Sequence, residues 1–138
     1  MVGGAVSMAI GDGIRRNVAK ISQVERDRLR DAFVQLNDAA NPARVYPDGV
    51  TKWFKQDEVH DATHVHAFPP YRGIAFLPWH REICNRLEAL LREVDPQLSL
   101  HYWDWETDPR HSPDGAGGFI DLFTAAFMGS PNGRAGAR

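Results

Sequence analysis

One apolar stripe, between Pro78 and Pro96, determines the longest element that this chain can form. Large apolar side chains recur there every three or four residues, at Ile83, Leu87, Leu90, Leu91 and Val94. This spacing places them on one face of an α-helix. Proline is tolerated in the first turn of a helix but breaks its interior. The sequence therefore predicts a long amphipathic helix that starts near Pro78, ends before Pro96 and buries one side.

Two shorter helices are predicted upstream. Ser22 and Glu25 have the spacing of a capping box, with Ser22 as the N-cap of a helix that runs to Asn37. The apolar side of this helix consists of Val24, Leu29, Phe33 and Leu36. A second helix is expected from about residue 50 to residue 60, with the apolar residues Val50, Trp53, Phe54 and Val59.

The remaining segments are expected to be less regular. Residues 63–78 are rich in proline and glycine, so we expect an irregular loop there. Residues 98–102 alternate in the manner of a short extended segment, and the apolar residues within 119–127 indicate one last short helix. The predicted fold class is therefore mainly α.

The composition limits the class of protein. With 138 residues, of which 43% are apolar and 25% charged, the chain fits one globular domain. The net charge is −2 and no basic cluster is present, so we expect neither nucleic acid nor a membrane surface as a partner. No apolar run approaches the ~20 residues of a membrane span. Residues 1–13 are interpreted as a loose leader and residues 129–138 as a flexible tail.

The single cysteine and the first residues bear on the compartment. Cys84 has no second cysteine to pair with in this chain, which fits a reducing compartment, and its apolar neighbours favour a buried structural thiol. The first ten residues lack the basic start and long apolar core of a secretory signal. We therefore expect a cytoplasmic protein.

Four of the six histidines lie close together in the sequence, at positions 60, 64, 66 and 80. On a helix, His60 and His64 would project from one face ~5–6 Å apart, which lets two imidazoles share an ion. Neutral imidazole is a common ligand of copper, zinc, iron and nickel. Exposed histidines that bind nothing fit the same spacing, so spacing alone leaves both interpretations open. No ligand role is assigned to His101 and His111, which stand apart.

Sequence motifs around His80 favour one family. Residues 76–82 read Phe-Leu-Pro-Trp-His-Arg-Glu, Glu88 follows His80 by eight residues, and residues 100–105 read Leu-His-Tyr-Trp-Asp-Trp. This combination resembles the tyrosinase and hemocyanin superfamily, the type-3 copper proteins, whose first copper site carries F-L-P-W-H-R and, further on, L-P-Y-W-D-W. The resemblance extends from about residue 14 to residue 129.

The resemblance implies a mainly α helical bundle in which two helix pairs each hold one copper ion through three histidines, with O2 bound between the metals. Residues 14–128 would be the first-copper half of this bundle, with long loops and a short extended segment. In this chain, the ligands of the first copper would be His60, His66 and His80.

The same resemblance implies roles for the residues that follow. Glu88 would accept a hydrogen bond from Arg16 or Arg81. The aromatic residues of the second motif would be core, with Asp104 as a buried hydrogen-bond acceptor; they are Tyr102, Trp103 and Trp105.

One departure from the family pattern concerns the ligand set. The pattern places a ligand nine residues before the histidine of F-L-P-W-H, and that position is Tyr71 here. Tyr71 is then a phenolate-type ligand, a residue that leaves the first copper short of a ligand, or a sign that His64 or His66 takes its place. We favour His66, because the loop that contains Pro69 and Pro70 would fold it back.

A second departure concerns the other copper site. The family needs three more histidines for it, and only His101 and His111 follow His80. His101 also stands where the family has proline. The chain would therefore supply one copper ion at most, and a second chain or segment would carry the other ion of the dinuclear centre.

The function implied by the resemblance is that of a copper-dependent oxidoreductase of the tyrosinase or catechol oxidase kind. It would oxidise phenols, o-diphenols or o-aminophenols with O2, complete only with the second copper site. Two alternatives stay open: an O2 carrier similar to hemocyanin, and a non-catalytic scaffold or binding module in which Tyr71 abolished the first site. Some relatives are exported with the aid of a helper protein, so secretion is the alternative to a cytoplasmic location.

Overall fold

The computed structural model describes residues 12–66 and 74–129, without the side chains of residues 64–66. The helices are α1 (Gln23–Leu36), α2 (Lys52–His66) and α3 (Phe76–Val94), with short 3-10 helices η1 (Pro42–Arg44) and η2 (Pro109–His111). Two-residue strands β1 (Ser112–Pro113) and β2 (Phe119–Ile120) form one antiparallel pair. The mainly α fold class is confirmed. The predicted leader and tail lie almost wholly outside the described residues.

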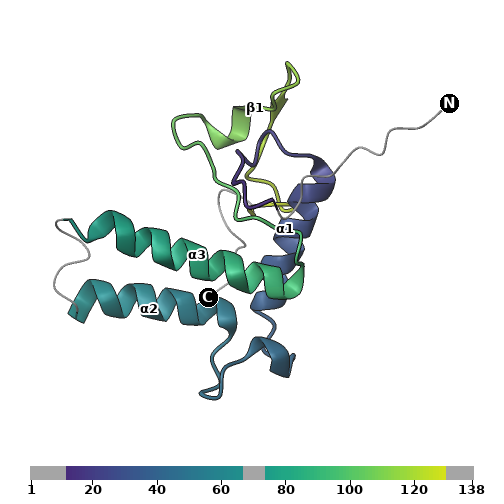
Figure 1. Ribbon diagram of the computed structural model, residues 1–138. Coiled ribbons are helices and arrows are strands. Elements are labelled where there is room, and N and C mark those ends of the chain that lie inside the picture. Colours follow the sequence, from purple (N-terminus) through teal and green to yellow (C-terminus); the bar gives the residue numbers. More distant parts are fainter. Residues whose placement is uncertain (1–11, 67–73, 130–138) are drawn as a thin grey trace.

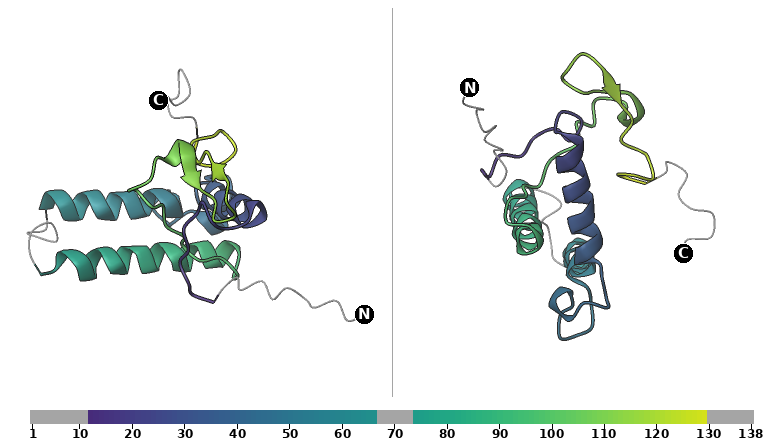
Figure 2. Two further views of the ribbon diagram at one scale, coloured as in Figure 1. Left: turned by 90° about the horizontal axis from the view of Figure 1, so that it is seen from above. Right: turned by 90° about the vertical axis from the view of Figure 1, so that its right-hand side faces the viewer.

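The helices α2 and α3 form an antiparallel hairpin that projects away from the rest of the molecule (Figure 1). Figure 2 shows the two helices side by side in one view, and in the other it shows α1 running across them. The core lies where α1 meets the last turns of α3. It consists of Val18, Ala19, Leu29, Ala32, Leu36, Leu90, Leu91, Leu98 and Leu122. None of the described helices is long and apolar enough to cross a membrane.

The helix α1 begins as predicted. The Ser22 side chain accepts a hydrogen bond from the backbone N–H of Glu25 at 3.2 Å, which is the N-cap half of a capping box. The Glu25 carboxylate instead lies 3.1 Å from the ring of His101. Leu29 and Leu36 are buried, whereas Val24 is 63% exposed and does not belong to the apolar side.

The helix α2 is longer than predicted. It ends at His66, so the irregular segment predicted over residues 63–78 was wrong for residues 63–66, as it was for 76–78, which begin α3. Residues 67–73 of that segment lie outside the described residues. A proline restricts itself and the residue before it, so Pro69 leaves the turn up to His66 free to stay helical. At the other end, the Thr51 hydroxyl accepts a hydrogen bond from the N–H of Phe54 at 3.3 Å and caps the helix.

The helix α3 follows the prediction closely. It starts two residues before Pro78, which lies in the first turn, and it ends two residues before Pro96. Leu90 and Leu91 are buried, and Leu87 packs against the core beside them. The part of the apolar stripe from Leu87 to Val94 thus faces the core, as its spacing indicated.

The helix predicted within residues 119–127 does not form. Phe119 and Ile120 pair with β1, and the chain then turns. The Asp121 side chain accepts a hydrogen bond from the N–H of Phe123 at 2.8 Å, an Asx turn that competes with a helix. Upstream, the predicted extended segment pairs only at Tyr102, through an isolated parallel bridge to Asn17.

The aromatic residues of the second motif are not core. Tyr102 is 52% exposed, Trp103 37% and Trp105 80%. Asp104 is half-buried and accepts a hydrogen bond from the N–H of Glu106 at 3.4 Å, within a turn closed by Thr107. Trp105 lies within this surface turn, and Trp103 contacts the ring of Phe123, with centroids 5.8 Å apart.

Candidate metal centre

Two of the sequence-predicted ligands face each other across the hairpin. His60 lies in the middle of α2 and His80 in the second turn of α3, and their ring centroids are 5.7 Å apart at an angle of 79°. Two imidazoles that share an ion, with each nitrogen about 2.0–2.1 Å from it, have centroids about 5–6 Å apart. The spacing of His60 and His80 therefore fits a metal ion held between α2 and α3.

The His80 ring is held in the form that a metal ligand needs. Its Nδ1 lies 2.8 Å from the carbonyl oxygen of Phe76, one turn earlier in α3. A carbonyl oxygen can only accept, so Nδ1 carries the hydrogen and donates it. In the neutral imidazole the lone pair is then on Nε2, and a backbone partner of this kind fixes both tautomer and ring orientation.

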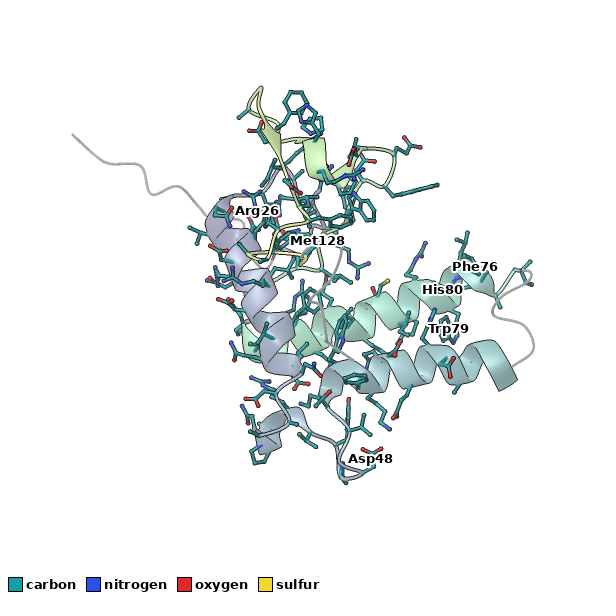
Figure 3. The ribbon with its side chains drawn as sticks, turned by 180° about the vertical axis from the view of Figure 1, so that it is seen from behind. Arg26, Asp48, Phe76, Trp79, His80 and Met128 are labelled. Carbon is teal, nitrogen blue, oxygen red and sulfur yellow. The ribbon has the colours of Figure 1, made fainter. Side chains whose placement is uncertain are left out.

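Aromatic rings pack against this pair of histidines. Figure 3 shows Phe76, Trp79 and His80 close together near the start of α3. The centroid of Phe76 lies 4.1 Å from that of His80, and the centroid of Trp79 lies 4.8 Å from it. The Trp79 ring also lies 5.7 Å from His60. The two imidazoles are therefore packed against apolar ring surface.

The third ligand is a prediction that the structure does not test. The side chains of His64 and His66 and all of Tyr71 lie outside what the structure describes. Among the described residues, no group of three or more His, Cys, Asp or Glu is placed to hold a metal ion. The premise for choosing His66 was wrong, however, because residue 66 belongs to α2 and not to a loop.

A cavity of about 420 Å³ lies along the seam, the contact between α2 and α3, one helical turn from His60 and His80. Its lining residues are Trp53, Gln56, Asp57, Ile83, Cys84 and Leu87. Cys84 is half-buried and lines this cavity, so the expectation of a buried structural thiol was wrong.

Glu88 ties α3 to two other segments. Its Oε2 accepts hydrogen bonds from Arg15 Nε at 3.0 Å and from the N–H of Leu100 at 2.8 Å, and Arg92 lies 3.3 Å from Oε1. Its partner is thus neither Arg16, which pairs with Asp12, nor Arg81. Burial acts to raise the pKa of Glu88, but the Leu100 N–H and Arg15 outweigh burial and hold that pKa below its usual value.

His101 has a structural role that the sequence did not reveal. Its side chain is 1% exposed, its Nδ1 accepts a hydrogen bond from the N–H of Arg16 at 3.0 Å, and its Nε2 lies 3.1 Å from Glu25 Oε1. Because Nδ1 accepts, the ring hydrogen is on Nε2 and is donated to the carboxylate. His111 stacks on Phe119, with 3.8 Å between centroids. Neither histidine lies at the metal centre.

Comparison with known proteins decides the family. The family model of the common central domain of tyrosinase matches residues 50–134, which include α2, α3 and both histidines of the seam. The chain belongs to the tyrosinase family. The residues around His80 lie within the matched range, and the mainly helical structure agrees with the helical-bundle domain of this family.

Similar proteins include enzymes and tyrosinase-like proteins. The chain is 36% identical over 124 residues to the tyrosinase-like protein tyr-3 of Caenorhabditis elegans, which covers 90% of this chain and 16% of the relative. It is 33% identical over 125 residues to grixazone synthase of Streptomyces griseus, covering 90% and 33%. It is 30% identical over 100 residues to a tyrosinase of Streptomyces glaucescens, covering 69% and 32%. The chain thus spans a third or less of the length of these relatives.

Copper is the cofactor to which membership of the tyrosinase family points, because tyrosinases and hemocyanins are dinuclear copper proteins. The donor set agrees with this metal, since imidazole nitrogen suits copper. The fixed tautomer of His80 and the spacing of His60 and His80 agree with it as well.

Proposed function

We propose that this chain forms the first-copper half of a type-3 copper oxidoreductase. The observation that carries the proposal is the pair of imidazoles from α2 and α3, His60 and His80, with centroids 5.7 Å apart inside the matched tyrosinase domain. We assign the unit to residues 14–128, because Val18 before α1 and Leu98 and Leu122 after α3 pack with α1 and the last turns of α3 around one core.

The chain's own residues would bind and shield the metal. His80 would present Nε2, because Nδ1 is committed to the Phe76 carbonyl, and His60 would bind from the opposite helix. A third imidazole would come from the last turn of α2, where His64 and His66 lie. Copper, when bound, carries electrons between the organic substrate and O2. The rings of Phe76 and Trp79 would limit the access of water to the ligands.

The same family membership supports a proposal for the substrate and the partner. We propose that the complete assembly oxidises phenols, o-diphenols or o-aminophenols with O2. We further propose that a second chain or segment supplies the other copper site, because the described residues bring only His60 and His80 together as imidazole ligands.

Metal analysis tests the proposal directly. The chain would be loaded with Cu(I) without oxygen, freed of excess metal and measured for copper per chain, beside the variants His60→Ala and His80→Ala. We expect up to one copper per wild-type chain and a large loss in both variants. The chain combined with the part of grixazone synthase that it does not match would then be assayed with an o-diphenol and an o-aminophenol. A wild-type chain that retains no copper, alone or combined, would refute the proposal.

A further inference from the structure

The cavity along the seam has the size and the walls of a site for a small molecule. Its volume of about 420 Å³ lies within the range of small-molecule pockets in proteins. Trp53, Ile83 and Leu87 supply apolar walls. The Trp53 ring also makes an edge contact with Phe33 of α1, with centroids 5.1 Å apart at an angle of 79°, so α1 helps to set its orientation. The cavity therefore presents an oriented ring surface to a flat ligand.

Two groups on the same walls supply chemistry. The Oε1 atom of Gln56 is buried and accepts no hydrogen bond within the part of the chain that the structure describes. A buried acceptor without a donor is unfavourable, so it favours a ligand that carries an O–H or N–H group. The thiol of Cys84 is free and half-buried, and it lines the cavity from the opposite helix. A ligand in this cavity thus meets both an acceptor and a nucleophile.

One class of molecule fits the ring surface, the acceptor and the nucleophile together, namely an o-quinone, which is the product of o-diphenol oxidation. The inference therefore rests on the proposed function. The thiolate, which is the nucleophilic form of cysteine, attacks a ring carbon of the o-quinone and forms a C–S bond. The thiol hydrogen and the hydrogen of the attacked carbon both move, as protons, to the two quinone oxygens. The quinone is reduced to an o-diphenol while the thiol is oxidised to a thioether, so the step needs no other reactant.

We propose that Cys84 is a site of covalent modification by o-quinones, which bind in the cavity before they react. Trp53 stacks on the quinone ring, and the o-diphenol that forms donates a hydroxyl hydrogen to Gln56 Oε1. Gln56 lies four residues before His60, and Cys84 lies four residues after His80, so the cavity is one helical turn from the proposed ligands. An o-quinone that leaves the metal centre therefore meets this thiol close to where it formed.

The test uses the copper-free chain and a quinone made beforehand, 4-methyl-o-benzoquinone freed of its oxidant. Intact mass and peptide mapping measure the rate of adduct formation at Cys84 as a function of quinone concentration. Cys84→Ser shows the background from other nucleophiles. Iodoacetamide, which needs no ring site, measures how accessible the thiol is. Circular dichroism shows whether each variant is folded.

Trp53→Leu removes the ring surface, and Trp105→Leu is its matched control, because Trp105 is 80% exposed and is not among the lining residues. We expect the wild-type rate to reach a plateau at high quinone concentration, since binding precedes reaction. Trp53→Leu should lower the ratio of the quinone rate to the iodoacetamide rate about threefold to tenfold, the usual effect of losing an aromatic ring contact. Trp105→Leu should keep the wild-type ratio.

Gln56→Leu tests the acceptor separately. In the wild type, 4-methylcatechol, the o-diphenol with the same ring, should slow the alkylation of Cys84 by iodoacetamide, because a hydroxyl group donates to Gln56 Oε1 and the ring covers the thiol. The protection should be weaker in Gln56→Leu, which has no acceptor. This measurement also decides the question if Trp53→Leu does not fold.

The outcomes separate this inference from the proposed function. A wild-type chain that retains no copper refutes the proposed function, whereas the quinone experiments need neither copper nor turnover. A quinone rate that rises linearly with concentration, with the same ratio to the iodoacetamide rate in a folded Trp53→Leu protein, refutes the modification site. Equal alkylation of wild-type Cys84 with and without 4-methylcatechol refutes it as well, because the cavity then holds no o-diphenol ring over the thiol.

Discussion

At the scale of single residues, Glu88 and His101 hold the segments before α1 and after α3 in place through hydrogen bonds. Glu88 joins α3 to Arg15 and to the backbone of Leu100, and His101 joins the backbone of Arg16 to the first turn of α1. Both side chains are buried and both bond to segments distant in sequence. Buried polar groups of this kind cost more when one partner is removed than they contribute as a pair.

Glu88→Gln should destabilise the fold in a pH-dependent way. The amide loses the charge that Arg15 and Arg92 face, so we expect a cost of about 1–3 kcal/mol near pH 7. Because the pKa of Glu88 is lowered in the folded state, its contribution is present above the unfolded pKa and is lost as the pH falls through the folded pKa. Urea unfolding at pH 7 and at about pH 3.5 measures the difference between wild type and variant. An equal difference at both pH values would contradict this account.

His101→Phe should also destabilise the fold. Phenylalanine fills the space but leaves the N–H of Arg16 and the Glu25 carboxylate without their partner, at a cost of about 2–3 kcal/mol. The matched control is His111→Phe, whose ring is exposed and stacks on Phe119, and for which we expect about 0.5 kcal/mol or less. Thermal and urea unfolding of the two variants decide the point: equal stabilities would mean that the His101 hydrogen bonds contribute little.

At the scale of elements, the sequence predicted what local spacing determines. The stripe of α3 and the Ser22 cap of α1 depend on residues a few positions apart, so both could be predicted. The end of α2 could not, because the prolines that follow act only on their near neighbours. The helix within 119–127 failed because pairing with β1 and the Asp121 turn competed with it.

The candidate site could also be predicted only in part from the sequence. The motif around His80 pointed to His60 and His80, and the structure places these two together. The hydrogen bonds His101–Glu25 and Glu88–Arg15 join positions more than seventy residues apart, and Glu88 also accepts a hydrogen bond from the backbone of Leu100. The sequence carries no local signal for contacts of these kinds. The same is true of the contact between Trp79 and His60, which exists only once α2 and α3 have paired.

The length of α2 predicts which histidine completes the first site. In a helix of 3.6 residues per turn, positions 60 and 64 lie about 40° apart around the axis, whereas position 66 lies about 120° away from position 60. We therefore expect His64→Ala to reduce Cu(I) affinity about tenfold or more, since losing a ligand costs at least as much as losing a group that orients one. His66→Ala should have little effect. Chelator competition on both variants distinguishes them, and the reverse order would restore His66 as the ligand.

At the scale of the whole molecule, the hairpin that carries His60 and His80 projects from the core (Figure 1). Apolar side chains on the hairpin and beyond it are exposed. Phe54 is 52% exposed, Leu77 72% and Trp105 80%. Because the chain spans a third or less of its relatives, we propose that the remaining part of such a bundle covers these side chains.

Trp105 offers a direct test of this arrangement. We expect iodide to quench its fluorescence strongly in the chain alone, because the ring is 80% exposed. Adding the part of grixazone synthase that this chain does not match should reduce the quenching and shift the emission to shorter wavelength, since burial removes the indole from water. The Trp105→Phe variant identifies the signal of this residue among the four tryptophans. The contrary outcome is a combined protein that oxidises an o-diphenol while Trp105 stays fully accessible to iodide. In that case the added part would cover the hairpin but not the turn that contains Trp105. The expectation that this aromatic motif is core would then fail for the complete assembly as well.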